Sequence, residues 1–311
     1  MAADDQITLV SMRPLYEGAN IRTWIGFKHL LYLVEQGVLQ WFRERGIGPQ
    51  RLYHEYGVGL AIVDSSALLL TLLEVDDQVV AEIILEKPGR FSVVLRVERK
   101  GSDAVVLKSK VAVALVREKG IGTAKPLPDH LAQFVVADLD STTSGLSRHD
   151  LHMGNGDNPR SILIPRGSQS FLWSWVARYF HCHYSDRVQH SAYTRALEEV
   201  VDRFLADRGI SVRHMLDEFS WIPVVSRVRV QLLADAHMEE TIHTTFVVEE
   251  ILKATLYSAR MDCYVGRRDT LVHTATSRIL HGYAISQGEG AGRLAELNES
   301  TLAVLNPEVC I

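Results

Sequence analysis

The stretch Phe180–Gly209, FHCHYSDRVQHSAYTRALEEVVDRFLADRG, predicts a short strand, a polar loop at Tyr184-Ser185-Asp186 and then a long helix. In the helical part, apolar residues recur at the spacing of one wide buried face. These residues are Tyr193, Ala196, Leu197, Val200, Val201, Phe204 and Leu205. Gly209 follows them, and glycine is the usual residue just past a helix end. The rest of the chain must therefore cover this helix.

The polar loop brings a carboxylate, Asp186, and a histidine, His190, to the predicted start of the helix. Backbone N–H groups at a helix N-terminus lack intrahelical partners and carry the positive end of the helix dipole, so they can polarise a carbonyl. A carboxylate beside them can act as a general base or as a nucleophile. The loop therefore indicates a site for attack on a carbonyl. The alternative is that Asp186 only caps the helix and His190 is solvated.

The composition narrows the class of protein. The chain has 311 residues, 47% of them hydrophobic, which predicts a sizeable core in one large domain or two ordinary ones. A net charge of -5 with mixed signs disfavours a nucleic-acid partner. No apolar run approaches the roughly 20 residues of a membrane helix. The N-terminal MAADDQ lacks a signal pattern. The three cysteines are too few for a disulfide framework. We therefore expect a cytoplasmic protein that acts without a membrane on a small molecule or a carried acyl group.

The order of predicted elements occurs twice along the chain. In the first half, a strand at 7–15 precedes a helix that closes at Arg45-Gly46, and four extended segments follow at 58–75, 78–86, 90–98 and 104–117. In the second half, a strand at 170–183 precedes the helix 193–208, and extended segments follow at 221–234, 241–251, 254–264 and 270–285. At an offset of 163 residues, Arg45-Gly46 matches Arg208-Gly209 and Glu35 matches Glu198. The chain is therefore expected to be an internal repeat.

This repeat predicts an α+β fold. A curved antiparallel sheet would wrap its apolar face around each long helix, and the two units would pack side by side as a pseudo-dimer. We expect an N-terminal half at 1–120, a linker at 121–169, a C-terminal half at 170–286 and a tail at 287–311, with the glycines at 288–292 leading into a final helix.

The second half resembles the double hotdog proteins of the 4-hydroxybenzoyl-CoA thioesterase and acyl-ACP thioesterase superfamily. The resemblance rests on an aspartate followed by a VxHxxY-like entry to the helix, with Leu197-Glu198-Glu199 further along; these loop residues are Asp186, Val188, His190, Ser191 and Tyr193. In the first half, Asn20 stands where the aspartate would be, and Trp24, Gly26 and Leu30 replace the polar and tyrosine positions. The spacing from Asp186 to Tyr193 is shorter than in the usual family loop, whereas Asn20 to Leu30 keeps it.

The resemblance implies hydrolysis of an acyl thioester of coenzyme A or of an acyl carrier protein. It gives Asp186 the role of base or nucleophile and His190 that of orienting water or the thioester. The amides from Ser191 to Tyr193 would hold the developing oxyanion.

Three further residues are candidates for the site. Some family members place a catalytic glutamate on the long helix, which makes Glu198 and Glu35 candidates; the alternative is that both are charges on the outer or interface side. Asn20 would donate a hydrogen bond to a carbonyl, or else hold the turn before the helix. Because the first-half loop offers an amide instead of a carboxylate, we expect unequal sites, of which the one built around Asp186 dominates.

No metal or organic cofactor is expected. His181 and His183 would share one face of a strand with Cys182 turned away, which leaves fewer ligands than zinc needs. The pair His149 and His152 is compatible with chelation but also with a solvated loop.

Two other functions remain open. One is addition to, or elimination from, an enoyl thioester, and the other is non-catalytic binding of an acyl group. A homo-oligomer is also left open.

Overall fold

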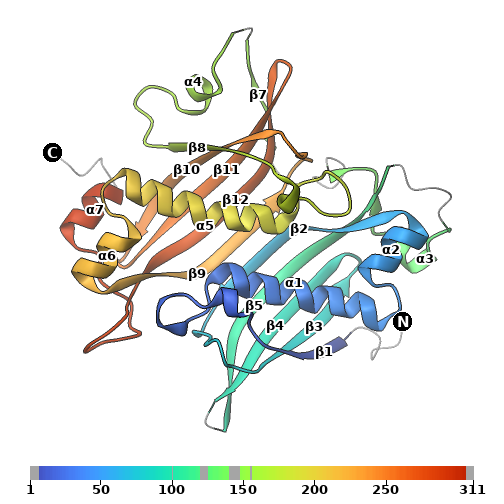
Figure 1. Ribbon diagram of the computed structural model, residues 1–311, viewed down its shortest axis with the longest axis horizontal. Helices are drawn as coiled ribbons and strands as arrows, with labels where there is room; N and C mark the ends of the chain where they lie inside the picture. The colour runs from blue at the N-terminus through green and yellow to red at the C-terminus, as the bar shows by residue number, and fades with distance from the viewer. Residues whose placement is uncertain (1–6, 100, 120–124, 140–147, 155, 306–311) are drawn as a thin grey trace.

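The computed structural model describes residues 7–99, 101–119, 125–139, 148–154 and 156–305. Their strands form one continuous sheet with the order β1-β3-β4-β5-β2-β9-β12-β11-β10-β8. The two long helices, α1 (Phe27–Glu44) and α5 (His190–Asp207), lie side by side against the same face of this sheet (Figure 1).

Each half contains one long helix and a set of antiparallel strands, as the sequence predicted, together with short helices. The first half contains β1 (Ile7–Met12), α1, α2 (Pro49–Tyr56), β2 (Val58–Leu69), β3 (Val79–Lys87), β4 (Arg90–Arg99) and β5 (Ser102–Arg117). The second half contains β8 (Phe171–Val176), α5, α6 (Val212–Phe219), β9 (Trp221–Leu232), β10 (Thr241–Leu252), β11 (Leu256–Arg267), β12 (Thr270–Ile285) and α7 (Glu299–Leu305). The segment between the halves contributes α3 (Asp129–Ala132), β6 (Val135–Val136), β7 (Leu151–His152) and α4 (Pro159–Leu163).

The largest differences from the predicted strand ends are in β2 and β8. β2 stops at Leu69, and β8 stops at Val176. The residues after β8 form a short 3-10 helix, Tyr179–His181, so the prediction that His181 and His183 share a strand face is wrong. The short helices α2 and α6 were not predicted, because eight residues give too little periodicity to recognise.

The apolar faces of the long helices form the centre of the core. On α1, Trp41 and Phe42 are almost fully buried, and their rings meet Phe91 of β4 edge to face or tilted. On α5, Phe204 packs against Phe246 of β10 in the same manner. Aromatic pairs of this kind add to the large apolar area that each ring removes from water. The helix periodicity in the sequence therefore corresponds to real burial.

The repeat is confirmed at the level of single residue pairs. Isolated bridges join Ala19 to Ile25 in the first half and Cys182 to Val188 in the second, at the same offset of 163 residues. The strands also carry matching β-bulges, which leave one residue without a paired neighbour. The bulged residues are Val63 and Ser226 in one pair of strands and Glu86 and Glu249 in another. The two halves are therefore two copies of one structural unit.

The two copies join through β2 and β9, which pair antiparallel in the middle of the sheet. The Arg229 guanidinium reinforces this junction by two hydrogen bonds to the Asp64 carboxylate, at 3.0 and 2.7 Å. The two predicted sheets are thus one sheet across the junction. Among the described residues, no helix has both the length and the hydropathy that a bilayer span requires.

Candidate functional site

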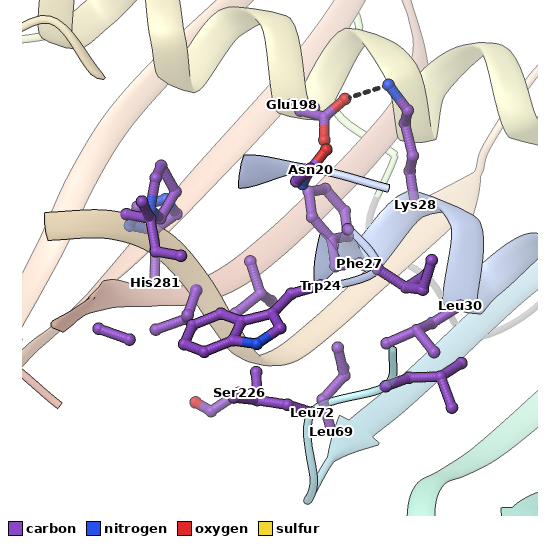
Figure 2. Close-up of a pocket in the computed structure, with 18 of the residues that line it drawn as sticks. Asn20, Trp24, Phe27, Lys28, Leu30, Leu69, Leu72, Glu198, Ser226 and His281 are labelled. Atoms are coloured by element: carbon purple, nitrogen blue, oxygen red, sulfur yellow. Dashed lines mark hydrogen bonds and ion pairs between the residues drawn. The ribbon is translucent and has the colours of Figure 1, made fainter. Parts of the chain in front are cut away.

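A cavity of about 660 Å³ lies between the loop that precedes α1 and the middle of α5. Most of its wall is apolar and comes from both halves; examples are Leu69, Leu72, Leu73, Val201, Ile222 and Val224. A few polar side chains converge on it. Figure 2 shows Asn20, Lys28 and Glu198 on one side of this cavity and His281 on the other. A mostly apolar cavity with few polar groups is the usual form of a small-molecule site.

The N-terminus of α1 forms part of the cavity wall. Gly26 precedes the first helical residue, and Phe27 and Lys28 follow it. The amides of Phe27 and Lys28 belong to the first turn, where helix geometry provides no intrahelical acceptor. Asn20 packs directly over this turn, because its Nδ2 lies only 2.7 Å from where a Cβ on residue 26 would be. Glycine at position 26 therefore makes room for the Asn20 amide at the helix start.

An ion pair links the two halves beside this helix start. The Lys28 ammonium lies 2.5 Å from Oε2 of Glu198 on α5, and both side chains are partly buried. Burial lowers the pKa of Lys28, but the hydrogen bond to Glu198 and the charge of Glu198 outweigh it, so the pKa is raised. The ion pair therefore holds the Glu198 side chain beside the start of α1, at the cavity.

The repeat creates an equivalent place in the other half, and there the cavity is almost absent. The small space of about 20 Å³ is lined by His183, Gln189 and His190, the counterparts of Asn20, Gly26 and Phe27 at the offset of 163 residues. Of these two places in the described part of the chain, the one that combines the first-half loop with α5 is open.

Bulky and charged side chains fill the closed site. Arg187, the counterpart of Trp24, forms ion pairs with Glu118 at 3.2 Å and with Asp235 at 3.0 Å. The Glu118 side chain is 2% exposed, so this is a buried network. Leu139, from the segment between the halves, is also buried there and lines the remaining space.

Comparison with known proteins identifies the architecture. No protein-family model matches the chain, and no curated protein matches it in sequence. Solved structures match over most of the chain. A protein assigned as an oleoyl thioesterase from Lactobacillus plantarum has a TM-score of 0.58 at 11% identity, covering 89% of this chain and 96% of that one. A 12:0-ACP thioesterase from Umbellularia californica has a TM-score of 0.59 at 8% identity, covering 89% and 97%.

A third structure agrees with these two. An acyl-ACP thioesterase from Bacteroides thetaiotaomicron has a TM-score of 0.52 at 11% identity, covering 90% of this chain and 100% of that one. The fold is a double hotdog. Identities this low establish the fold alone, and the chemistry of this double hotdog must be argued from its own residues.

The loop correspondence predicted from sequence is wrong by three residues. The matching bridges place His183, and not Asp186, opposite Asn20 in the repeat, while Asp186 corresponds to Thr23. This explains why the spacing from Asp186 to Tyr193 looked short. The spacing from His183 to Tyr193 equals that from Asn20 to Leu30, so the second-half loop has its normal length and carries a histidine at the aspartate position.

Asp186 does not lie over the helix N-terminus. Its side chain is 59% exposed, and its Oδ1 lies 3.3 Å from Nδ1 of His237. The equivalent contact in the first half is the hydrogen bond from Thr23 to Glu74 at 2.6 Å. Asp186 is absent from the described walls of both cavities. The contact between Asp186 and His237 therefore holds a turn, as the contact between Thr23 and Glu74 does in the first half.

The other predicted residues of the second-half loop are buried in packing. The Nε2 atom of His190 lies 3.1 Å from Oγ of Ser65 and 3.3 Å from the Val230 carbonyl oxygen. Burial lowers the pKa of His190 to about 4, so it is neutral at neutral pH. Ser191 and Tyr193 are also buried, and Tyr193 packs against Trp175 in the core. Helix α5 thus begins at His190, within the closed site.

Of the remaining candidates, the structure brings Asn20 and Glu198 together at the open cavity and leaves Glu35 apart. Glu35 is the counterpart of Glu198 on α1, and burial raises its pKa to about 7, with Arg195 acting in the opposite direction. Glu198 is paired with Lys28, which lies at the start of α1. The counterpart of Lys28 at the start of α5 is Ser191, so Glu35 has no lysine at that place. The two glutamates therefore have different partners.

The cavity also has polar residues that were not predicted from the sequence, among them Lys28, Asp202 and His281. Asp202 lies one turn after Glu198 on the same helix face, which was a readable signal. Lys28 and His281 gave none, because their relation to Glu198 depends on contacts between the halves. Among the described residues, no three His, Cys, Asp or Glu side chains are grouped to hold a metal ion.

Proposed function

We propose that the protein hydrolyses an acyl thioester at the open cavity between the first-half loop and α5. The observation that carries this proposal is the convergence of a helix N-terminus, the Asn20 amide and the Glu198 carboxylate on one mostly apolar cavity. The full-length likeness to thioesterases adds the fold in which such a reaction is known to occur.

The residues divide the work of hydrolysis. The thioester oxygen accepts hydrogen bonds from the first-turn amides of α1, which stabilise the negative charge that develops on it. The Asn20 side chain donates a further hydrogen bond or positions the carbonyl. The acyl group occupies the apolar part of the cavity.

Glu198 activates water as a general base. It removes a proton while the water oxygen bonds to the thioester carbon, and collapse of the tetrahedral intermediate breaks the carbon–sulfur bond. The proton on Glu198 then passes to the departing thiolate, so the products are a carboxylic acid and a thiol. Lys28 holds the Glu198 carboxylate in place at the cavity through their ion pair.

The experiment is a thiol-release assay across short, long, branched and aromatic acyl-CoAs, followed by the same assay on variants with the best substrate. Loss of a general base costs on the order of 10²–10⁴-fold in rate, so Glu198→Gln should reduce turnover by that much. The matched control is Glu35→Gln, which makes the same change at the equivalent position of the closed site and should leave turnover near the unmodified level.

Three outcomes would contradict the proposal. Asp186→Asn reducing turnover as deeply as Glu198→Gln would return the chemistry to the second-half loop. A change in enoyl absorbance without thiol release would favour addition or elimination on an enoyl thioester. Tight binding without turnover of any thioester would favour a non-catalytic acyl-binding protein.

A further inference from the structure

His281 of β12 is a buried histidine that lines the open cavity, 3% exposed. Within the described part of the chain its Nδ1 has no hydrogen-bond partner. The rings of Tyr257 and Tyr283 hold the imidazole, with centroids at 4.9 and 5.5 Å. Burial lowers its pKa to about 3, so the imidazole is neutral at neutral pH and has one donor and one acceptor nitrogen. A buried polar atom without a partner is costly, which calls for an explanation.

A second polar group lines the same cavity. Asp202 lies one turn after Glu198 on α5, which places the two Cα atoms about 6 Å apart along the helix axis. Its side chain is partly accessible to solvent. Loss of solvation next to the surrounding protein is the main cause that raises its pKa to about 6, and the negative charge of Glu198 is the second. A carboxylate at neutral pH thus lies one helical turn beyond Glu198 on the wall of the cavity.

The repeat shows that the fold does not require polar residues at these two positions. The counterpart of Asp202 on α1 is Leu39, at the offset of 163 residues. His281 pairs with Val225, and in the first half Ile62, the counterpart of Val225, pairs with Val113. Leucine and valine therefore occupy the corresponding places in the first half. Both polar residues belong to the open site specifically.

The position of His281 beside a β-bulge strengthens this contrast. Ser226 is the bulged residue between Val225 and Arg227, and both Val225 and Ser226 line the cavity. Bulges re-aim side chains and are common next to functional sites. At the first-half bulge, Val63, the residue of the partner strand that corresponds to His281 is Val113.

We propose that the acyl group bound in this cavity carries a hydroxyl group, which His281 and Asp202 recognise. A hydroxyl can donate to the Asp202 carboxylate and accept from the imidazole N–H, or donate to the unprotonated nitrogen, whereas a plain alkyl chain satisfies neither. This inference rests on the proposed acyl site and deepens it by naming the class of acyl group. A site built to bind a hydroxyl discriminates strongly against the analogue that lacks it, because its polar groups are then left unpaired.

The test measures binding, so that it does not depend on turnover. The probes are acyl-pantetheine amides, in which nitrogen replaces the thioester sulfur, with a saturated chain that carries one hydroxyl at successive carbons. Each is compared by calorimetry with the unsubstituted chain of the same length. We expect at least one hydroxyl position to bind about tenfold to hundredfold more tightly than the plain chain.

Two variants assign this preference to the named residues. His281→Val and Asp202→Leu introduce the residues that the first half has at the corresponding places, Val113 and Leu39. The same structural unit therefore folds with these residues there. Each should lower the preference for the hydroxylated amide about tenfold while plain-chain binding is retained, and Glu35→Gln is the matched control that should keep the preference.

The inference is overturned if the plain chain binds at least as tightly at every hydroxyl position, if the preference survives both substitutions, or if no amide binds. The proposed hydrolysis can fail separately. Selective binding of a hydroxylated amide without any thiol release from the matching thioester would leave the inference standing and remove the proposed reaction.

Discussion

Glu198 and Glu35 occupy the same position in the repeat, yet their surroundings give them different properties. Glu198 is ion-paired with Lys28 at the open cavity, whereas burial raises the pKa of Glu35 to about 7. A residue type at a matching position therefore does not imply a matching role. The difference comes from the opposite half, which places the Lys28 ammonium beside Glu198 and has Ser191 at the corresponding position near Glu35.

Glu35 should make the protein lose stability as pH rises. Its pKa in the folded state is about 7, above the ordinary value of 4.5, so the folded protein holds a proton that the unfolded chain has released. The free energy of unfolding should therefore fall between about pH 4.5 and 7 and level off above that range. Glu35→Gln should remove this decline and add on the order of 1–3 kcal/mol at pH 8. Urea unfolding at successive pH values measures both, and parallel profiles for the two proteins would contradict the prediction.

Gly26→Ala should impair the site without unfolding the protein. The backbone at residue 26 suits alanine, with φ of -64°, but the added Cβ would lie 2.7 Å from Nδ2 of Asn20 and displace it. We expect about a tenfold loss of turnover, comparable with that of Asn20→Ala, since both remove one hydrogen-bond donor from the site. The double variant provides the check, because two changes acting through one side chain should not add. Additive losses in the double variant would show that Gly26 acts in some other way.

At the scale of elements, the two loops before the long helices have the same backbone plan but different side chains. Trp24 leaves space beside α5, whereas its counterpart Arg187 extends to Glu118 and Asp235 and closes the space beside α1. The closed site is thus a packed ionic junction, which explains why the space there is so small.

Removing Arg187 should be strongly destabilising. Arg187→Ala would leave the carboxylate of Glu118, which is 2% exposed, buried without its cation. Breaking a buried pair in this way costs about 3–5 kcal/mol, so urea unfolding should reveal a loss of that size. The double variant Arg187→Met with Glu118→Gln removes both charges and should regain part of the loss. A single variant as stable as the original protein would show that the pair contributes nothing.

At the scale of the whole molecule, the two halves depend on each other. β2 pairs with β9, and side chains on α1 and α5 meet through Lys28 and Glu198. Separation would expose both a strand edge and the inner helix sides, and such surfaces drive aggregation. The open site would also be lost, since its wall comes from both halves.

A fragment of residues 1–135 should therefore fail to behave as an independent domain. We expect it to aggregate or to unfold without a cooperative transition, since it would lose the pairing with β9 and the contact with α5. Size-exclusion chromatography and thermal unfolding measure this directly. A soluble monomer with a sharp unfolding transition would show that the halves are separate domains.

The sequence by itself determined the long helices, most of the strands and the repeat. These follow from local periodicity and turn residues, which act over a few positions and are visible without a structure. Glu198 and Asn20 also became candidates at that stage, through the resemblance of the helix and its preceding loop to those of the thioesterase superfamily. Asp186 was misplaced, because residue type was given more weight than the distance counted back from Tyr193, which points to His183.

Only the tertiary structure decided which of the two equivalent places is an open cavity. That outcome depends on side chains brought together from distant segments: Arg187 with Glu118, Leu139 from the connecting segment, and on the open side Lys28 with Glu198. None of these pairs leaves a periodic signal, because each joins residues far apart in the chain. A cavity is what packing leaves unfilled, so it exists only once every neighbouring side chain has been placed.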